Sequence, residues 1–397
     1  MKIPTFEMER WQSLWENHVE YNLSESGVQP LTPAKLLEIS GTDPLLQLPL
    51  GYGHTNGTPE LRAAIAAMYA GASVDNVVCT NGGSEANFVV CWNLFEPGDE
   101  VAMMLPQYMQ MPGLARYYGI RLRPFFLRAE LNWQPDLDEL ESAVNEKTRA
   151  IVVCNPNNPT GAVLEEAAMQ RIVALAGRFN CWIVADEIYR GSEFDGRLTP
   201  SFWGLYDRVL ITSGLSKAYG LPGLRIGWVA GPAEKISELW SCRDYTSIAV
   251  AAPSDLLAQL ALEPQQRERI LARTRGILQA NFPILEKWLE EHADDFEYTS
   301  PQAGAICWVR DRRRRRSSEL VEALRKIESV LVVPGDQLEM DGYLRFGFGY
   351  DAQKLERALE RISRFLRLQA SGSRLGGIVS DFNPQSAIPW SLEPYMD

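Results

Sequence analysis

The sequence contains no long apolar run, no closely paired cysteines and no excess of basic residues. No stretch reaches the ~18 apolar residues that a membrane-spanning helix needs, and the N-terminus lacks the apolar core of a secretion signal. The six cysteines are scattered without a CxxC pair, several of them in apolar strand patterns. We therefore expect reduced core thiols, no metal site and a cytoplasmic protein that does not contact a membrane.

The charge balance of the 397 residues excludes a further class of function. The formal net charge is -12 and the isoelectric point is about 5.0. Nucleic-acid binding requires a basic surface, so nucleic acid is not an expected partner. Small molecules, including cationic ones, remain open. The hydrophobic content of 46% is typical of a globular chain with a substantial core.

From about residue 75 the sequence predicts an α/β fold. Short strands that are apolar nearly throughout indicate a sheet buried on both faces. Their alternation with helices implies right-handed crossovers and a mainly parallel central sheet sandwiched by helices. The expected strands lie near 77–80, 101–105, 150–154, 182–185, 209–212 and 226–229, with helices near 84–95, 135–146 and 164–178.

The predicted organisation is two domains with a segment at each end. Long helices dominate after residue 232, and a smaller α+β unit follows them. We place the large domain at 46–280 and the small domain at 281–368. Residues 1–45 are expected to pack on the small domain. Residues 369–397 have a linker-like composition and receive no role.

In such a sheet, ligands bind beyond the carboxyl ends of the strands, so the residues that follow the strands are the candidates for chemistry. Gly83 and Ser84 open a helix whose N–H groups could seat a phosphate, although a plain tight turn is the alternative. Tyr108 could stack on a flat ligand or only border the core. Asn158, in a turn with two Asn-Pro pairs, could donate a hydrogen bond into the site or serve the turn alone.

An acid and a lysine follow the next two strands. Asp186 comes directly after an apolar strand, where a buried acid needs a positive partner; a helix N-cap is the alternative role. Lys217 lies among small and apolar residues, and lysine forms Schiff bases when its surroundings make it nucleophilic. Arg225 follows eight residues later and could hold a phosphate. On this stretch alone, a surface turn with two ordinary cations fits equally well.

One cofactor needs all of these groups at one sheet edge. Pyridoxal 5'-phosphate is a flat cation whose aldehyde a lysine holds covalently. Its pyridine nitrogen needs an acid partner, and its phosphate needs backbone N–H groups and an arginine. The sequence therefore predicts a pyridoxal-phosphate site.

The order and spacing of these motifs resemble the class I/II aminotransferases, which are fold-type I pyridoxal-phosphate enzymes. The resemblance covers about residues 20–367. In one respect the chain departs from it: a serine that many relatives carry three residues before the lysine is Gly214 here, and Ser213 or Ser216 could compensate. The motifs are Asn157-Asn158-Pro159-Thr160-Gly161, Asp186-Glu187-Ile188-Tyr189, Leu215-Ser216-Lys217-Ala218-Tyr219-Gly220 with Arg225, and Tyr343-Leu344-Arg345-Phe346.

The resemblance implies roles around the cofactor ring. Lys217 would form the Schiff base and later shuttle a proton. Asp186 would keep the pyridine nitrogen protonated, so that the ring can act as an electron sink. Tyr189 and Asn158 would hydrogen-bond the ring hydroxyl, and Tyr108 would stack on the ring face.

The resemblance also implies how the phosphate and the substrate are held. Arg345 would clamp the substrate α-carboxylate in a bidentate fork, with Gly27 and Asn158 beside it. Tyr52 resembles the tyrosine that reaches the neighbouring subunit's phosphate, which implies a homodimer with shared active sites. The implied phosphate ligands within the subunit are Gly83, Ser84, Ser216 and Arg225.

These motifs leave the reaction open, because a fold does not fix its chemistry. Transamination of an amino acid is the first interpretation. Elimination at Cβ or Cγ with cyclisation of a hydroxylated arginine is the second, and a pyridoxal-phosphate-binding protein without turnover is the third. The dicarboxylate-specific arginine of aspartate-type relatives has no recognisable counterpart, so aspartate is a disfavoured substrate.

The cyclising alternative depends on a similarity to the capreomycidine synthase branch, whose members act on hydroxylated arginines. The similarity lies in residues 24–28, 215–225 and 243–245. A cationic guanidinium substrate would suit acids near the entrance of the site, namely Glu7, Glu9 or Glu25. The alternative for these glutamates is ordinary exposed charge on a helix and a loop.

Overall fold

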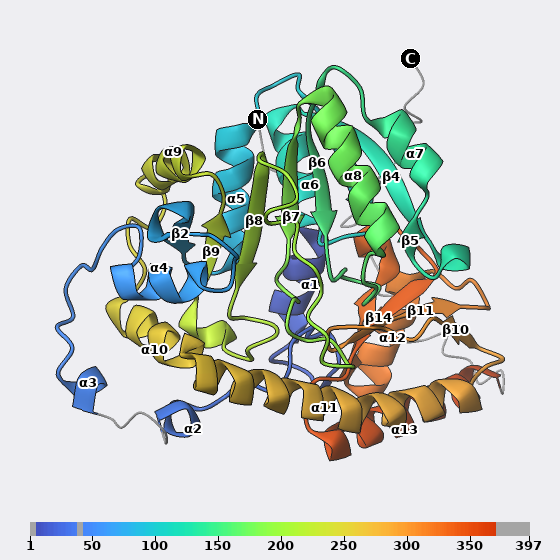
Figure 1. The fold of residues 1–397 in the computed structure, drawn as a ribbon. Helices are drawn as coiled ribbons and strands as arrows, with labels where there is room; N and C mark the ends of the chain where they lie inside the picture. The colour runs from blue at the N-terminus through green and yellow to red at the C-terminus, as the bar shows by residue number, and fades with distance from the viewer. Residues whose placement is uncertain (1–4, 38–42, 371–397) are drawn as a thin grey trace.

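The computed structural model describes residues 5–37 and 43–370, and its larger body is built on an eight-stranded sheet (Figure 1). The strands are β2 (Val77–Thr80), β3 (Glu100–Leu105), β4 (Arg121–Arg128), β5 (Gln134–Pro135), β6 (Thr148–Cys154), β7 (Trp182–Asp186), β8 (Val209–Gly214) and β9 (Gly227–Ala230). Their order in the sheet is β2-β9-β8-β7-β6-β3-β4-β5. Neighbours from β8 to β4 pair in parallel, whereas β9 runs antiparallel to both β8 and β2.

The predicted α/β fold with a mainly parallel sheet is confirmed. Strand β4 was not predicted, because most of its residues are only partly buried or exposed and its first half alternates arginine with leucine and proline. Such a composition lacks the continuous apolar run that marks the central strands.

Helices cover both faces of this sheet. Alternate strand residues point to opposite faces, so Val152 joins the core under one helical layer while Ile151 and Val153 join the other. The first layer contains α5 (Gly83–Leu94), α6 (Gln110–Tyr118) and α9 (Ala233–Arg243). The second contains α4 (Pro59–Ala66), α7 (Leu137–Ala143), α8 (Glu166–Phe179) and α10 (Ala252–Leu262).

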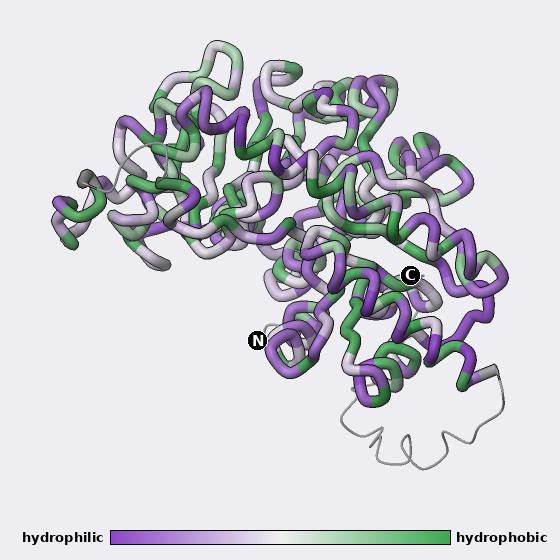
Figure 2. Tube along the Cα trace, turned by 90° about the horizontal axis from the view of Figure 1, so that it is seen from below, coloured by the Kyte–Doolittle hydropathy of each residue, from purple (hydrophilic) through white to green (hydrophobic). Residues whose placement is uncertain are grey.

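The smaller body has its own sheet, in the order β10-β11-β14-β13, and its own apolar core. Its elements are β10 (Phe296–Tyr298), β11 (Ile306–Asp311), α12 (Ser317–Glu328), β12 (Val330–Leu331), β13 (Val333–Pro334), β14 (Tyr343–Gly347) and α13 (Ala352–Ala370). Viewed from below, the trace separates into a larger and a smaller body (Figure 2).

Helix α11 (Pro264–Glu291) runs along the base of both bodies (Figure 1). Ile270 near its start packs in the core of the large body, whereas Leu278 and Leu285 pack in the core of the small one. The proposed domain boundary near residue 280 falls inside this helix and stays a prediction. The tail expected from residue 369 lies almost wholly outside the described residues.

The N-terminal segment reaches between the two bodies and then passes to α10 of the larger body. Helix α1 (Glu7–Trp15) contacts β13, and β1 (Tyr21–Asn22) pairs in parallel with β12. The short helices α2 (Pro33–Leu37) and α3 (Asp43–Leu46) lie apart from the sheet (Figure 1). The stretch of residues 47–57 that follows them is called the arm below. It carries Leu50 and Tyr52, which are 87% and 88% exposed.

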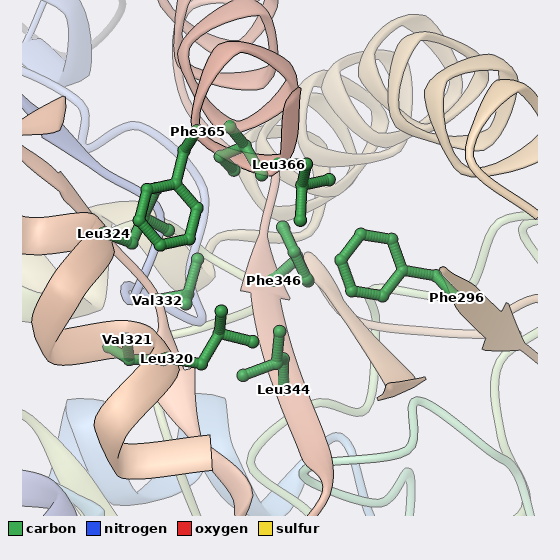
Figure 3. Close-up of a pocket in the computed structure, with 10 residues that line it drawn as sticks. Phe296, Leu320, Val321, Leu324, Val332, Leu344, Phe346, Phe365 and Leu366 are labelled. Atoms are coloured by element: carbon green, nitrogen blue, oxygen red, sulfur yellow. The ribbon is translucent and has the colours of Figure 1, made fainter. Parts of the chain in front are cut away.

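A small apolar pocket lies inside the core of the small body. Figure 3 shows Phe296, Phe346 and Phe365 around it, with side chains from β14, α12 and α13. Its volume of about 10 Å³ is room for one water at most, and its lining has no polar group for a ligand. This pocket is therefore a packing gap. Among the described helices, none is long and apolar enough to span a bilayer.

Candidate active site

The carboxyl ends of β7 and β8 place Asp186 and Lys217 at the same edge of the large sheet. Asp186 is the last residue of β7 and is 8% exposed. Its carboxylate accepts hydrogen bonds from the Asn87 side chain at 3.2 Å and from the Ile188 N–H at 3.0 Å. Burial raises the pKa of Asp186, against the opposing effects of Asn87, Ile188 and Lys217. A buried acid held by neutral donors is suited to a cationic ligand.

Lys217 forms an ion pair with Glu25 from the N-terminal segment. Its Nζ lies 2.9 Å from Glu25 Oε1, and the same oxygen accepts the N–H groups of Ser26 and Gly27, each at 2.8 Å. The charge of Lys217 lowers the pKa of Glu25 to about 2. Burial, the largest single effect, would lower the pKa of Lys217, but the charge and hydrogen bond of Glu25 together with Tyr189 outweigh it, so the pKa of Lys217 is raised.

The start of α5 and Arg225 come together as the sequence predicted for a phosphate seat. Helix α5 begins at Gly83, and its N-cap, Gly82, has φ +87° and no side chain to cap the first turn. The Arg225 guanidinium packs directly against Gly82, and its Nη2 donates to the Asn81 carbonyl at 3.3 Å. A cation and uncapped helical N–H groups thus face the same space, which is the arrangement that binds phosphate.

Close packing of β8 against the chain that precedes β9 explains why Gly214 replaces a serine. A Cβ on Gly214 would lie 2.8 Å from the Ile226 carbonyl oxygen, so a larger residue would force a shift. Ser213, one of two residues expected to compensate, instead donates its hydroxyl to the Glu187 carbonyl at 3.2 Å. The role of Ser216, the other candidate, stays a prediction.

Arg345 reaches the site from β14 of the small body. It is 1% exposed; its Nη1 donates to Asn158 Oδ1 and its Nη2 to the Ser24 carbonyl, both at 2.8 Å. Within the described part of the chain, Arg345 Nε and the hydroxyl of buried Tyr189 have no hydrogen-bond partner. Buried polar atoms are seldom left without a hydrogen-bond partner, so these two atoms indicate that a polar ligand binds here.

The other residues that the sequence predicted for the site lie in different parts of the structure. Tyr108 donates its hydroxyl to Glu9 of α1 at 2.7 Å, which ties the ring to the N-terminal helix. Gly27 lies beside Lys217, where a Cβ would be 3.7 Å from the lysine Cδ. Tyr52 lies on the arm, and its side chain is exposed within its own subunit. Glu7 has an exposed side chain, and partial desolvation together with the nearby charge of Asp336 raises its pKa.

Comparison with known proteins decides the family. The family model described as aminotransferase class I and II matches residues 47–362. Capreomycidine synthase from Streptomyces vinaceus is 31% identical over 378 residues, 94% of this chain and 97% of that protein. The chain belongs to the class I and II aminotransferase family.

Further relatives agree with this assignment. An aspartate/prephenate aminotransferase from Thermus thermophilus is 29% identical, with 79% of this chain and 83% of that protein matched. A crystal structure of a PLP-dependent aminotransferase from Streptococcus suis is 34% identical, with a TM-score of 0.87 over 92% of this chain and 98% of that one. The resemblance stated from the sequence is confirmed, together with the fold.

The residues of this family member fit pyridoxal phosphate, its cofactor. Lys217 would carry the aldehyde, Asp186 would face the pyridine nitrogen, and Arg225 with the start of α5 would bind the phosphate. The unpaired hydroxyl of Tyr189 is a donor of the kind that the ring hydroxyl needs. Each of these roles is an assignment from position and chemistry.

Sequence reasoning missed two contacts of this site. Asn87 fixes Asp186, and its signal was a polar residue inside the otherwise apolar run of α5. The pair of Glu25 with Lys217 spans 192 residues of sequence. Nothing in the local pattern of the N-terminal loop indicates which strand end it will meet.

Proposed function

We propose that this pyridoxal-phosphate enzyme transfers the amino group of an amino acid, with Lys217 at the reacting centre. The observation that carries the proposal is the convergence of four groups from separate elements. Asp186 and Lys217 come from adjacent strand ends, Arg225 faces the start of α5, and Arg345 arrives from the other sheet. No packing requirement of the fold alone calls for two buried or half-buried cations and an acid at one edge.

Three residues of the chain have separate roles in the proposed reaction. The bound cofactor supplies an electron sink for charge that develops at the substrate Cα. Asp186 holds a proton at the pyridine nitrogen, since its carboxylate is buried and fixed by Asn87 and Ile188. Lys217 Nζ takes the proton from Cα and returns it on the next step as general base and acid. Arg345 orients the substrate through its α-carboxylate.

We further propose that the preferred substrate carries a positive charge on its side chain. Glu25 is held by two N–H groups in the ionised form next to Lys217. Once the lysine is joined to the cofactor, its ammonium no longer neutralises this carboxylate. Glu9 supplies a second acid at the Tyr108 edge of the site. A guanidinium or ammonium side chain would restore the charge balance.

A second candidate function is elimination and cyclisation of a hydroxylated arginine. It is supported by the similarity to capreomycidine synthase over nearly the whole chain. The groups assigned above serve both reactions, which diverge only after the Cα proton has been removed.

Mixing the holoprotein with single amino acids in the absence of a keto acid separates these functions. Transamination predicts loss of the visible absorbance of the lysine-linked cofactor and release of one equivalent of keto acid, measured by absorbance and mass spectrometry. A ring product from a hydroxylated arginine without keto acid would instead establish cyclisation. If no amino acid in a complete panel altered the cofactor, the protein would be a non-catalytic binder.

The substrate class is tested with Glu25→Gln. We expect the ratio of kcat/KM for arginine to that for alanine to fall about tenfold or more, because a hydrogen bond to a charged group contributes ~1.5–3 kcal/mol. The ratio cancels any effect on Lys217 that is common to both substrates. Glu20→Gln, which removes a surface pair with Arg361, is the matched control. An unchanged ratio in Glu25→Gln would contradict the assignment.

We also propose that two copies form a homodimer in the cytoplasm. The proposal is supported by the arm, on which the side chains of Leu50 and Tyr52 are almost fully exposed. Exposed apolar side chains on an extended segment are stable when a partner surface covers them. Tyr52 would then reach the phosphate of the second copy.

A further inference from the structure

Arg243, at the end of α9, is a fully buried arginine outside the site described so far, with an exposed fraction of 0%. Its Nη1 donates to the carbonyl of Thr55 at the root of the arm, and its Nη2 to the hydroxyl of Ser247 at 3.3 Å. Its Nε lies 3.4 Å from Oε2 of Glu85. One guanidinium therefore joins the arm, the loop after α9 and the first turn of α5.

Glu85 occupies an electrostatically unfavourable place for a phosphate enzyme. It lies in the first turn of α5, the same turn that offers its N–H groups to the phosphate. Burial would raise its pKa, but the N–H of Asn81, the hydroxyls of Ser247 and Thr246 and the charge of Arg243 together lower it. The group is therefore a carboxylate at neutral pH, and its field opposes a phosphate dianion at that helix end.

The same carboxylate also shapes the phosphate turn. Its Oε2 accepts the N–H of Asn81 at 2.5 Å, and the carbonyl of Asn81 accepts from Arg225 at 3.3 Å. Its Oε1 accepts the hydroxyls of Thr246 and Ser247, each at 2.6 Å. Glu85 thus holds the turn in place while its charge works against the ligand that the turn binds.

We propose that Arg243 is a positioning residue that neutralises Glu85, so that the turn keeps its shape without repelling the cofactor phosphate. This inference rests on the proposed phosphate site at the start of α5. An arginine suits the task because its planar fork serves three acceptors in different directions. The contact with Thr55 makes the same group an anchor for the arm that carries Tyr52.

The test compares the affinity of pyridoxal phosphate with that of pyridoxal, which lacks the phosphate. Both can join Lys217, and both are measured by absorbance titration of the apoprotein. Arg243→Met is expected to weaken pyridoxal phosphate on the order of tenfold, because an uncompensated charge then faces the phosphate. Pyridoxal should change by less than about threefold. A merely structural defect would weaken both ligands alike, and that result would overturn the proposal.

A rescue experiment is the second part of the test. Arg243→Met combined with Glu85→Gln should recover most of the lost affinity, since the repelling charge is removed. Glu85→Gln alone should bind pyridoxal phosphate at least as tightly as the wild type. If Arg243→Met does not fold, as judged by circular dichroism, Glu85→Gln decides: selective weakening of pyridoxal phosphate in that variant would contradict the proposal.

A matched control distinguishes the effect of losing a contact with the arm from the effect of losing the charge beside Glu85. Arg62 also secures the arm root, donating to the carbonyls of Gly57 and Val74, but it does not contact Glu85. Arg62→Met should leave the ratio of the two affinities unchanged, and a shift like that of Arg243→Met would refute the charge argument. If the wild type itself bound no pyridoxal phosphate, the proposed function would fail instead.

Discussion

Replacing Lys217 with alanine is expected to remove both the covalent attachment of the cofactor and the base that moves the Cα proton. General acid–base catalysis alone contributes about 10²–10⁴-fold, so turnover should fall by at least that factor. The visible absorbance of the lysine-linked cofactor should be lost at the same time. Binding through Asp186 and Arg225 should persist in part, because those contacts do not involve the lysine.

A control variant and one contradicting result complete the test of Lys217→Ala. Lys235→Ala is the control, because Lys235 lies on α9 beside Glu238 and Asn93, away from the strand ends. It should retain the absorbance and the activity of the wild type. Retention of the linked-cofactor absorbance in Lys217→Ala would contradict the assignment of the active site, whatever the substrate.

The second large effect is expected from Arg345→Lys. Lysine keeps the charge but not the planar fork, so the substrate α-carboxylate loses one of its two parallel donors. Loss of one partner of a buried charge pair costs on the order of 2–5 kcal/mol, which corresponds to a fall of about 30-fold or more in kcat/KM. Steady-state kinetics with the best amino acid of the panel measures this fall.

The control for Arg345 uses the substrate as well as the protein. An amine analogue that lacks the carboxylate should react equally slowly with wild type and Arg345→Lys, because the lost donor has no partner on it. Arg310→Lys, on the neighbouring strand β11 and paired only with Glu297 among the described residues, should behave as wild type. An equal loss with both substrates would show that Arg345 supports the fold and does not hold the carboxylate.

Much of this site could be predicted because it follows directly from strand position. Asp186 and Lys217 come at the ends of apolar strands, and parallel strands deliver their carboxyl ends to one edge. The proposed phosphate turn could be recognised as well, since glycines at the N-cap and at the first helical position leave the first N–H groups of α5 without a side-chain cap. Arg345 was assigned by resemblance alone, because its strand belongs to another sheet.

What could not be predicted depends on contacts between distant parts of the chain. The pair of Glu25 with Lys217 and the bond of Glu9 to Tyr108 exist only because the N-terminal segment returns between the two bodies. Ser213 illustrates a different limit. The sequence alone does not say which neighbour a hydroxyl will contact, and in the structure Ser213 donates to the Glu187 carbonyl.

The central claim is that Lys217 holds the cofactor, and one measurement tests it most directly. The holoprotein is reduced with borohydride to make the lysine–cofactor bond permanent, digested, and mapped by mass spectrometry. The account predicts a single phosphopyridoxyl group on the peptide that contains Ser216-Lys217-Ala218. A label on any other lysine, or a cofactor that washes out after reduction, would contradict it.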